Sequence, residues 1–562
     1  MDATRSQASL PTGGQIEGGA ELPGVRPRFA LSLPGSDVEL SRYSMFVILY
    51  ATGFLLEMVE HWRYPGFTAA AVLLAVFMVY NTTRLSFLSF LVLTTGYLII
   101  FRFPEVANHV NLLIFCNIAL IFGLIYSFAR PSVCSNDGIF LEVIQPILQL
   151  MIIITFSVAG FHKLNYDFIN PQVSCIADFS RTFYGLLGTS FLGMPAAVTI
   201  GLVALATAYL LWRHVPRPTM PKVDVGAILV PGLALVACFF ALLTVVDLST
   251  IASPRHLFIF LVAVIILCWQ LVEGPLLLVR RFQWFALCLC LLVHAQLAMI
   301  GFVDFQSLAI ALIMTFVPAG VLDAWNRRRT VSLLGVSMHR VHAYFLLNLI
   351  GGFASGFNAY FHNFIDIKVL SGVLFNIGLL ILLWPIITDV CSRDRTWRWD
   401  GVQVLDRRTP GFLYIFPIAL LLFGLTSHFG LRTAGNFSMF SNLRTEGEHS
   451  NHLLFRNNPL KFGGYQEDIV TVHQIDDEAV GAGHKFRSLS GYALPVVEFK
   501  KLLLLWREND QVVPMNFEYN GKTYVTDNVV AEPDWQVSGL NWEMKLLDFR
   551  LIQPDGPNLC RW

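Results

Sequence analysis

The sequence has few charged residues for its length. Only 14% of its 562 residues are Asp, Glu, Lys or Arg, whereas soluble globular proteins contain about 25%. Its 39 basic and 39 acidic residues give no net charge, so bulk charge indicates no nucleic-acid partner. The nine cysteines include no CxxC pair, so we predict no zinc or iron–sulfur site and no metal cofactor.

The N-terminus also lacks the apolar core of a cleavable signal peptide. We predict that residues 1–40 form a flexible cytoplasmic tail. Apolar sequence, in contrast, is abundant, because 55% of the residues are hydrophobic. These residues are grouped in runs, and a helix needs about 20 such residues to cross a bilayer.

The apolar runs predict an α-helical polytopic membrane protein with about thirteen transmembrane segments between residues 41 and 430. The short second run could instead be re-entrant. The runs lie near residues 43–60, 65–80, 84–101, 110–128, 141–162, 194–212, 226–247, 255–279, 283–302, 306–325, 341–361, 368–388 and 412–430.

Basic residues are concentrated in alternate loops, whereas the loops between them have almost none. Because cytoplasmic loops carry the excess of Lys and Arg, the pattern predicts a cytoplasmic N-terminus and a periplasmic or lumenal region after Gly430. The residues that carry this pattern are Arg213, Arg217 and Lys222, then Arg280 and Arg281, then Arg327–Arg329 and Arg340, then Arg393, Arg395, Arg398, Arg407 and Arg408.

Residues 431–562 differ in character and predict a small, β-rich α+β domain outside the membrane. The segment FEYNGKTYV has strand-like arms on both sides of Asn520-Gly521, which is a strong hairpin signal. Residues 495–510 are typical of a helix that begins with proline. The apolar run 502–506 could lie on the membrane or on the transmembrane helices.

Lys163 lies at the outer end of the predicted span 141–162, directly after His162. A lysine at a helix end commonly extends its ammonium group into the lipid headgroups. Two further observations suggest a functional site instead. A polar cluster that includes Asn165 and Asp167 follows Lys163. In addition, segment 163–193 is too polar to cross a bilayer and too hydrophobic to be a free loop. This segment could fold back as a lid over a pocket.

Other polar groups fall in or beside the apolar runs. Asn108 and His109 begin the run 110–128 on the outer side, where Asn108 could simply cap the helix. His294 lies inside the run 283–302, and a histidine within a span marks either a site or a buried hydrogen bond.

Four segments, in this order along the chain, resemble the vitamin K-dependent γ-glutamyl carboxylases and their bacterial relatives with a horizontally transferred transmembrane (HTTM) domain. The resemblance covers residues 41–450 in patches, so region 41–430 resembles the HTTM transmembrane domain. The segments are VANHVNLLIFCNIAL, FSVAGFHKLNYDFINP, LVHAQLAMIGF and GNFSMFSNL.

The resemblance implies a lyase-type membrane enzyme that uses a reduced vitamin K or related quinol, with O2 and CO2 as co-substrates. Lys163 matches the family's catalytic base, and His294 matches a family histidine to which we assign a catalytic role. Asn108 and His109 match an Asn-His pair at the quinol site, and His162, in place of a second family lysine, is a further substrate-binding candidate. Quinol epoxidation would accompany carboxylation of a glutamate in a peptide or protein on the outer side.

The chain departs from the family in having an extra stretch between Lys163 and His294 and a much shorter outer domain. A membrane transporter and a non-catalytic scaffold of the same family are therefore alternative interpretations. Cys175 and Cys560 are both predicted on the outer side, where an oxidising compartment would allow a disulfide.

Overall fold

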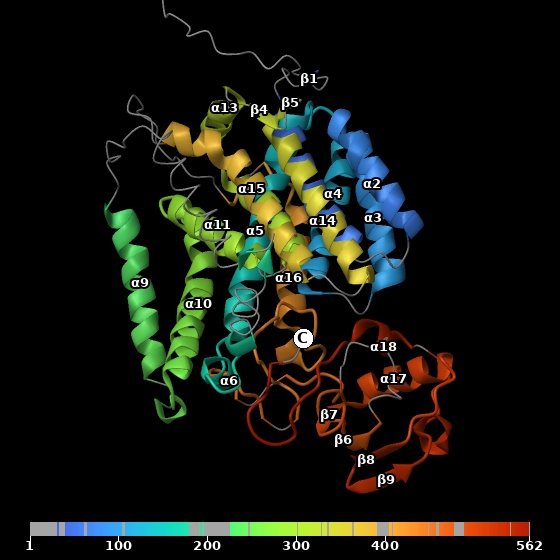
Figure 1. Cartoon of the computed structure of the whole chain (residues 1–562). Helices are drawn as coiled ribbons and strands as arrows, with labels where there is room; N and C mark the ends of the chain where they lie inside the picture. The colour runs from blue at the N-terminus through green and yellow to red at the C-terminus, as the bar shows by residue number, and fades with distance from the viewer. Residues whose placement is uncertain are drawn as a thin grey trace, which may run out of the picture.

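The structure is a computed structural model in which the helices form a bundle and the C-terminal region forms a separate lobe at one end of it (Figure 1). It describes residues 31–32, 40–60, 65–103, 107–178, 190–191, 194–195, 225–244, 248–299, 302–327, 329–333, 336–361, 365–390, 404–406, 408–447, 449–456, 460–476, 488–539 and 541–560. The predicted span near 194–212, apart from residues 194–195, and most of the predicted N-terminal tail lie outside these residues.

The described helices of the bundle follow the predicted apolar runs closely. They are α1 (Arg42–Glu60), α2 (Pro65–Tyr80), α3 (Arg84–Tyr97) with a π-helical extension (Leu98–Arg102), α4 (Asn108–Ala129), α5 (Asp137–His162), the short α6 (Tyr166–Ile169), α9 (Val225–Leu243), α10 (Pro254–Leu278), α11 (Gln283–Met299), α12 (Val303–Ile313), α13 (Ala319–Arg327), α14 (Arg340–Phe361), α15 (Ile365–Val390) and α16 (Ile415–Gly424).

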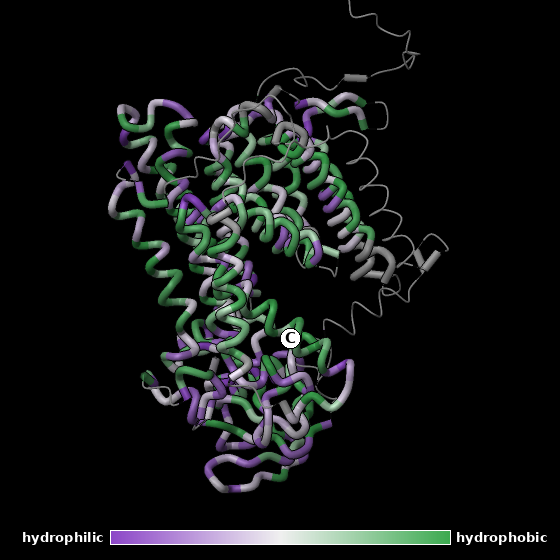
Figure 2. The backbone as a smooth tube through the Cα atoms, turned by 90° about the vertical axis from the view of Figure 1, so that its left-hand side faces the viewer, coloured by the Kyte–Doolittle hydropathy of each residue, from purple (hydrophilic) through white to green (hydrophobic). Residues whose placement is uncertain are grey.

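Six of the described helical segments are long and apolar enough to cross a membrane, and shorter apolar helices accompany them. Apolar residues dominate the bundle, whereas the C-terminal lobe is more polar (Figure 2). The chain is therefore a mostly helical protein suited to a lipid bilayer. The predicted span near 306–325 is interrupted, because a 3-10 turn (Met314–Phe316) follows α12 and α13 begins only at Ala319. Pro318 disfavours helical backbone in the residue before it, and Val317 is indeed extended.

Helix α5 is the most deeply buried of the candidate spans. It packs against α4, α10, α12 and α16. At Gly160 the backbone of α10 approaches so closely that an added Cβ would lie 2.8 Å from the carbonyl group of Gln270. This close approach fixes the C-terminal end of α5, which is where Lys163 follows.

The C-terminal lobe contains an antiparallel sheet in the order β7-β6-β8-β9. The predicted hairpin is present, with positive φ at both Asn520 and Gly521. The elements are β6 (Ile469–Ile475), β7 (Tyr492–Pro495), α17 (Val496–Glu508), β8 (Met515–Tyr519), β9 (Lys522–Thr526) and α18 (Trp542–Leu546).

Helix α17 begins after Pro495, as predicted, but its apolar run does not lie on the membrane. Leu502, Leu503 and Trp506 are buried in the core that α17 forms with the sheet. The prediction that residues 502–506 contact the membrane or the transmembrane helices is therefore wrong. The apolar residues of α17 pack against the sheet of the same lobe instead.

A second, smaller sheet lies at the end of the bundle opposite the C-terminal lobe (Figure 1). It comprises β1 (Leu31–Ser32), β4 (Thr330–Leu333) and β5 (Val336–His339), and β2 (Ser190–Phe191) pairs with β3 (Met194–Pro195) elsewhere. The basic segment that begins at Arg327 therefore lies at the bundle end far from the C-terminal lobe.

Candidate functional site

Lys163 is buried where α5 meets the C-terminal lobe. Its backbone caps the C-terminus of α5, and its side chain is only 6% exposed. Lys163 Nζ donates hydrogen bonds to the carbonyl oxygens of Met439, at 3.1 Å, and Ala159, at 3.4 Å. The ammonium group therefore lies inside the protein rather than among lipid headgroups.

The electrostatic surroundings of Lys163 disfavour a positive charge. Burial, reinforced by the nearby guanidinium of Arg550, lowers the pKa of Lys163 from 10.5 to about 7. Among the described residues, Lys163 forms no ion pair with a carboxylate. Arg550 is fixed by hydrogen bonds to the carbonyl oxygens of Ser438 and Leu443. A lysine that is neutral near pH 7 can accept a proton.

The segment 435–443 forms a cover over the ends of α4, α5 and α12 that face the C-terminal lobe. Asn111 of α4 donates a hydrogen bond to the carbonyl of Gly435, and the rings of Phe302 and Phe440 lie 5.2 Å apart. Phe437, Phe440 and Asn442 have positive φ, which is uncommon for residues other than glycine. These contacts position the Met439 carbonyl against Lys163.

His162 faces a group of aromatic side chains that sequence reasoning had missed. Its Nε2 lies 3.3 Å from the Ser427 hydroxyl, and its ring centroid lies 5.5 Å from that of His428. The ring of His452 lies 5.1 Å from that of His428, and Phe161 contacts all three histidines. No local spacing signals this cluster, because its members come from three distant segments.

His109 is held between two carboxylates. Its Nε2 lies 3.0 Å from Glu57 Oε2 and 2.8 Å from Asp304 Oδ2, and all three side chains are buried. Asn108 does not cap α4, because the N-cap is Ala107 and Asn108 is the first helical residue. Sequence reasoning found His109 but missed both carboxylates, which lie in other helices.

His294 shares one aromatic neighbour, Phe305, with His109 but makes different contacts. Its Nδ1 bonds to the side-chain oxygen of Gln306, and its ring lies 5.5 Å from Phe156 and 5.8 Å from Phe305. The ring of His109 also neighbours Phe305, at 6.1 Å. The structure thus places both His109 and His294 beside Phe305. Phe156 belongs to α5, the helix that ends just before Lys163.

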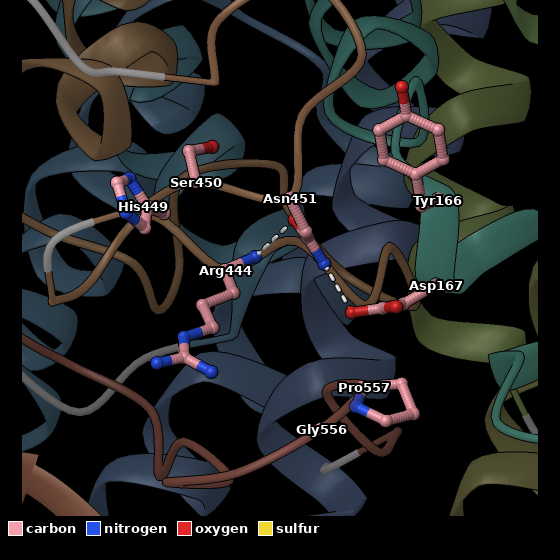
Figure 3. A pocket seen from close by; sticks show the side chains of 8 residues that line it. All are labelled: Tyr166, Asp167, Arg444, His449, Ser450, Asn451, Gly556 and Pro557. Atoms are coloured by element: carbon pink, nitrogen blue, oxygen red, sulfur yellow. Dashed lines mark hydrogen bonds between the residues drawn. The ribbon is translucent and has the colours of Figure 1, made fainter.

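The predicted lid packs between the bundle and the C-terminal lobe over residues 163–178, the longer of its two described stretches. It borders a cavity of about 570 Å³ (Figure 3). Asp167 points toward Asn451 and accepts hydrogen bonds from its side chain and from the Asn558 backbone. Burial raises the pKa of Asp167. The lining residues are Tyr166, Asp167, Arg444, His449, Ser450, Asn451, Gly556 and Pro557.

The two outer cysteines singled out in the sequence are joined in the structure. Cys175 and Cys560 form a disulfide with their Cα atoms 4.8 Å apart. The Cys175 amide also donates to the side chain of Asn442, which in turn donates to the carbonyl of Asn558. The bond therefore attaches the chain's C-terminal segment to the lid at the position that borders the cavity.

No protein-family model, curated protein or solved structure matches the chain. The candidate site is therefore interpreted from its own geometry. That geometry consists of a buried lysine that disfavours charge, two histidines around Phe305 inside the bundle, and a polar cavity on the side of the C-terminal lobe.

Proposed function

We propose that the protein is a membrane enzyme in which Lys163 acts as a general base on a lipid-soluble quinol. The observation that carries the proposal is the burial of Lys163 Nζ against two carbonyl oxygens, with Arg550 rather than a carboxylate nearby. A base must be unprotonated at the working pH. The lowered pKa of about 7 supplies that condition.

The position of Lys163 suits a substrate that dissolves in lipid. It follows the last residue of a candidate membrane span, so a quinol could reach it from the bilayer. Phe156 and Phe305 would provide apolar contacts for a ring system, and the buried Nδ1 of His109 has no hydrogen-bond partner among the described residues. That nitrogen could bond a quinol oxygen. Asn108 Oδ1 is buried without a described partner as well.

The proposed chemistry follows the family that the four motifs resemble. Lys163 removes a hydroxyl proton from the quinol, and the quinolate reacts with O2. One oxygen atom enters the quinone as an epoxide, and the other leaves as water. When a glutamate and CO2 are present, the oxygenated intermediate removes a γ-proton, and the carbanion forms a bond to CO2. The C-terminal lobe and the basic residues Arg444 and His449 of the cavity favour an acidic peptide as that partner.

The deciding test is quinol epoxidation by the purified protein. Lys163→Ala and Lys163→Arg should both lose turnover, because alanine has no basic group and arginine stays protonated. Wild-type turnover should rise with pH through about 7 as Lys163 loses its proton. Lys501→Arg is the matched control, since Lys501 is also buried but is paired with Glu498. Epoxide formation retained in Lys163→Ala would refute the proposal.

The alternative functions make different predictions. A transporter would move a solute into proteoliposomes without forming epoxide, and a scaffold would co-purify with a stable partner without turnover. We also propose that the N-terminus is cytoplasmic and the C-terminal lobe periplasmic or lumenal. The position of the basic segment from Arg327 at the opposite end of the bundle supports this orientation. Labelling of single cysteines from either side of the membrane tests it.

A further inference from the structure

Three helices bring two carboxylates and an imidazole together inside the bundle. Glu57 comes from α1, His109 from α4 and Asp304 from α12. One potential ligand atom from each lies within 4.8 Å of the other two. All three residues are buried, with exposures of 3%, 9% and 7%. Buried carboxylates in a membrane bundle are costly unless they are paired or bind a cation.

The second oxygen of each carboxylate is already engaged. Glu57 Oε1 lies 3.4 Å from Arg102 Nη2, and Asp304 Oδ1 accepts the backbone amide of Phe305 at 2.7 Å. Each carboxylate is thereby oriented so that one oxygen faces Nε2 of His109. Partners of this kind commonly fix the ligands of a metal ion.

The two distances from His109 Nε2 to the carboxylate oxygens match adjacent corners of an octahedron. Bonds of about 2.1 Å at right angles place neighbouring ligand atoms about 3 Å apart, whereas a tetrahedral ion would place them about 3.4 Å apart. The observed distances from His109 Nε2 are 3.0 Å and 2.8 Å. Hydrogen bonding alone explains these two contacts less well, because His109 Nε2 carries at most one hydrogen and faces two carboxylate oxygens.

We propose that Glu57, His109 and Asp304 bind one divalent first-row transition-metal ion, such as Mn²⁺ or Fe²⁺. A mixed set of one imidazole and two carboxylates suits these ions better than Mg²⁺ or Ca²⁺, which prefer oxygen ligands alone. Three protein ligands leave octahedral positions open for water or another small molecule. The inference goes beyond the proposed function and does not depend on it, because it concerns metal binding and not turnover.

Metal binding by the full-length protein in detergent tests the proposal directly. After treatment with a chelator, the protein is titrated with Mn²⁺ alone, and bound metal is measured by electron paramagnetic resonance and elemental analysis. The wild type should bind one ion per chain and gain thermal stability. Glu57→Gln and Asp304→Asn keep the side-chain shape and should weaken binding at least tenfold. Glu273→Gln, which alters another buried carboxylate near Cys290, should bind like the wild type.

The outcomes separate the metal site from a simple ion-pair cluster. Binding that is absent from the wild type, or unchanged in Asp304→Asn, would overturn the proposal and leave a protonated His109 between two carboxylates. Equal affinity for Mg²⁺ would overturn the assignment to a transition metal. Size-exclusion chromatography checks that the variants fold, and His109→Gln replaces any carboxylate variant that does not.

Discussion

Replacing Lys163 with methionine should make the protein more stable at low pH while removing its proposed activity. Methionine fills a similar volume without a charge. The lysine pKa falls from 10.5 to about 7 on folding, and each pKa unit corresponds to about 1.4 kcal/mol. Carrying the protonated lysine into the folded state therefore costs up to about 5 kcal/mol, and this full cost applies below pH 7.

The sign of the pH dependence follows from proton binding. Between about pH 7 and pH 10.5 the unfolded chain binds more protons at Lys163 than the folded chain does, so this residue makes wild-type stability rise with pH. Between pH 6 and pH 9 the rise amounts to about 2.5 kcal/mol. Lys163→Met lacks this contribution, so its stability advantage over the wild type should be about 2.5 kcal/mol larger at pH 6 than at pH 9.

Denaturant titration in mild detergent, followed by tryptophan fluorescence, measures this difference at the two pH values. Lys501→Met is the matched control, because Lys501 is also buried but lies 3.0 Å from the carboxylate of Glu498. Removing that cation should destabilise the protein by about 3–5 kcal/mol. If the advantage of Lys163→Met were equal at pH 6 and pH 9, Lys163 would not titrate in this range, and its assignment as a base would lose its physical support.

Three further predictions concern the structure around Lys163. Cys560→Ser should leave Cys175 free to react with a maleimide and should lower stability by up to about 6 kcal/mol, the loop-closure value for a 385-residue separation; intact mass and thermal unfolding measure both effects. Gly160→Ala should cost about 1–3 kcal/mol because its Cβ would meet the α10 backbone, whereas Gly96→Ala, with open space around it, should not destabilise. The Asn165 side chain donates hydrogen bonds to the carbonyl oxygens of His162 and Ser441 and accepts one from the Phe168 amide, so Asn165→Ala should cost about 2–4 kcal/mol in the same unfolding assay.

Local patterns in the sequence were sufficient to predict the helices and the hairpin, but not which elements pack against one another. The length of the apolar runs predicts the helices, and Asn520-Gly521 predicts the hairpin, because both depend on neighbouring residues. The surface against which the apolar run of α17 packs is a sheet formed by distant strands. It could therefore not be predicted from the neighbouring residues alone. Whether the described helices add up to thirteen spans also depends on segments outside the described residues.

The candidate site shows the same division between local and distant information. Lys163 and His109 are conspicuous because they interrupt or border apolar runs. Glu57 and Asp304 are single acidic residues at helix ends, where they have no distinctive spacing. Their relation to His109 arises only when α1, α4 and α12 pack together. The same holds for Arg550, which is 387 residues from Lys163 in the sequence and yet influences its pKa.

The state of Lys163 depends on the C-terminal lobe, so the lobe belongs to the candidate site. Docking of this region contributes to the lowered pKa, since the Met439 carbonyl lies against Lys163 Nζ and Arg550 adds a nearby positive charge. Without that cover, a lysine at the end of a membrane span would extend toward water and remain protonated. The disulfide between Cys175 and Cys560 ties the end of the lobe to the segment that follows Lys163. The covalent link therefore helps to maintain the environment in which the lysine can be neutral and can act as a base.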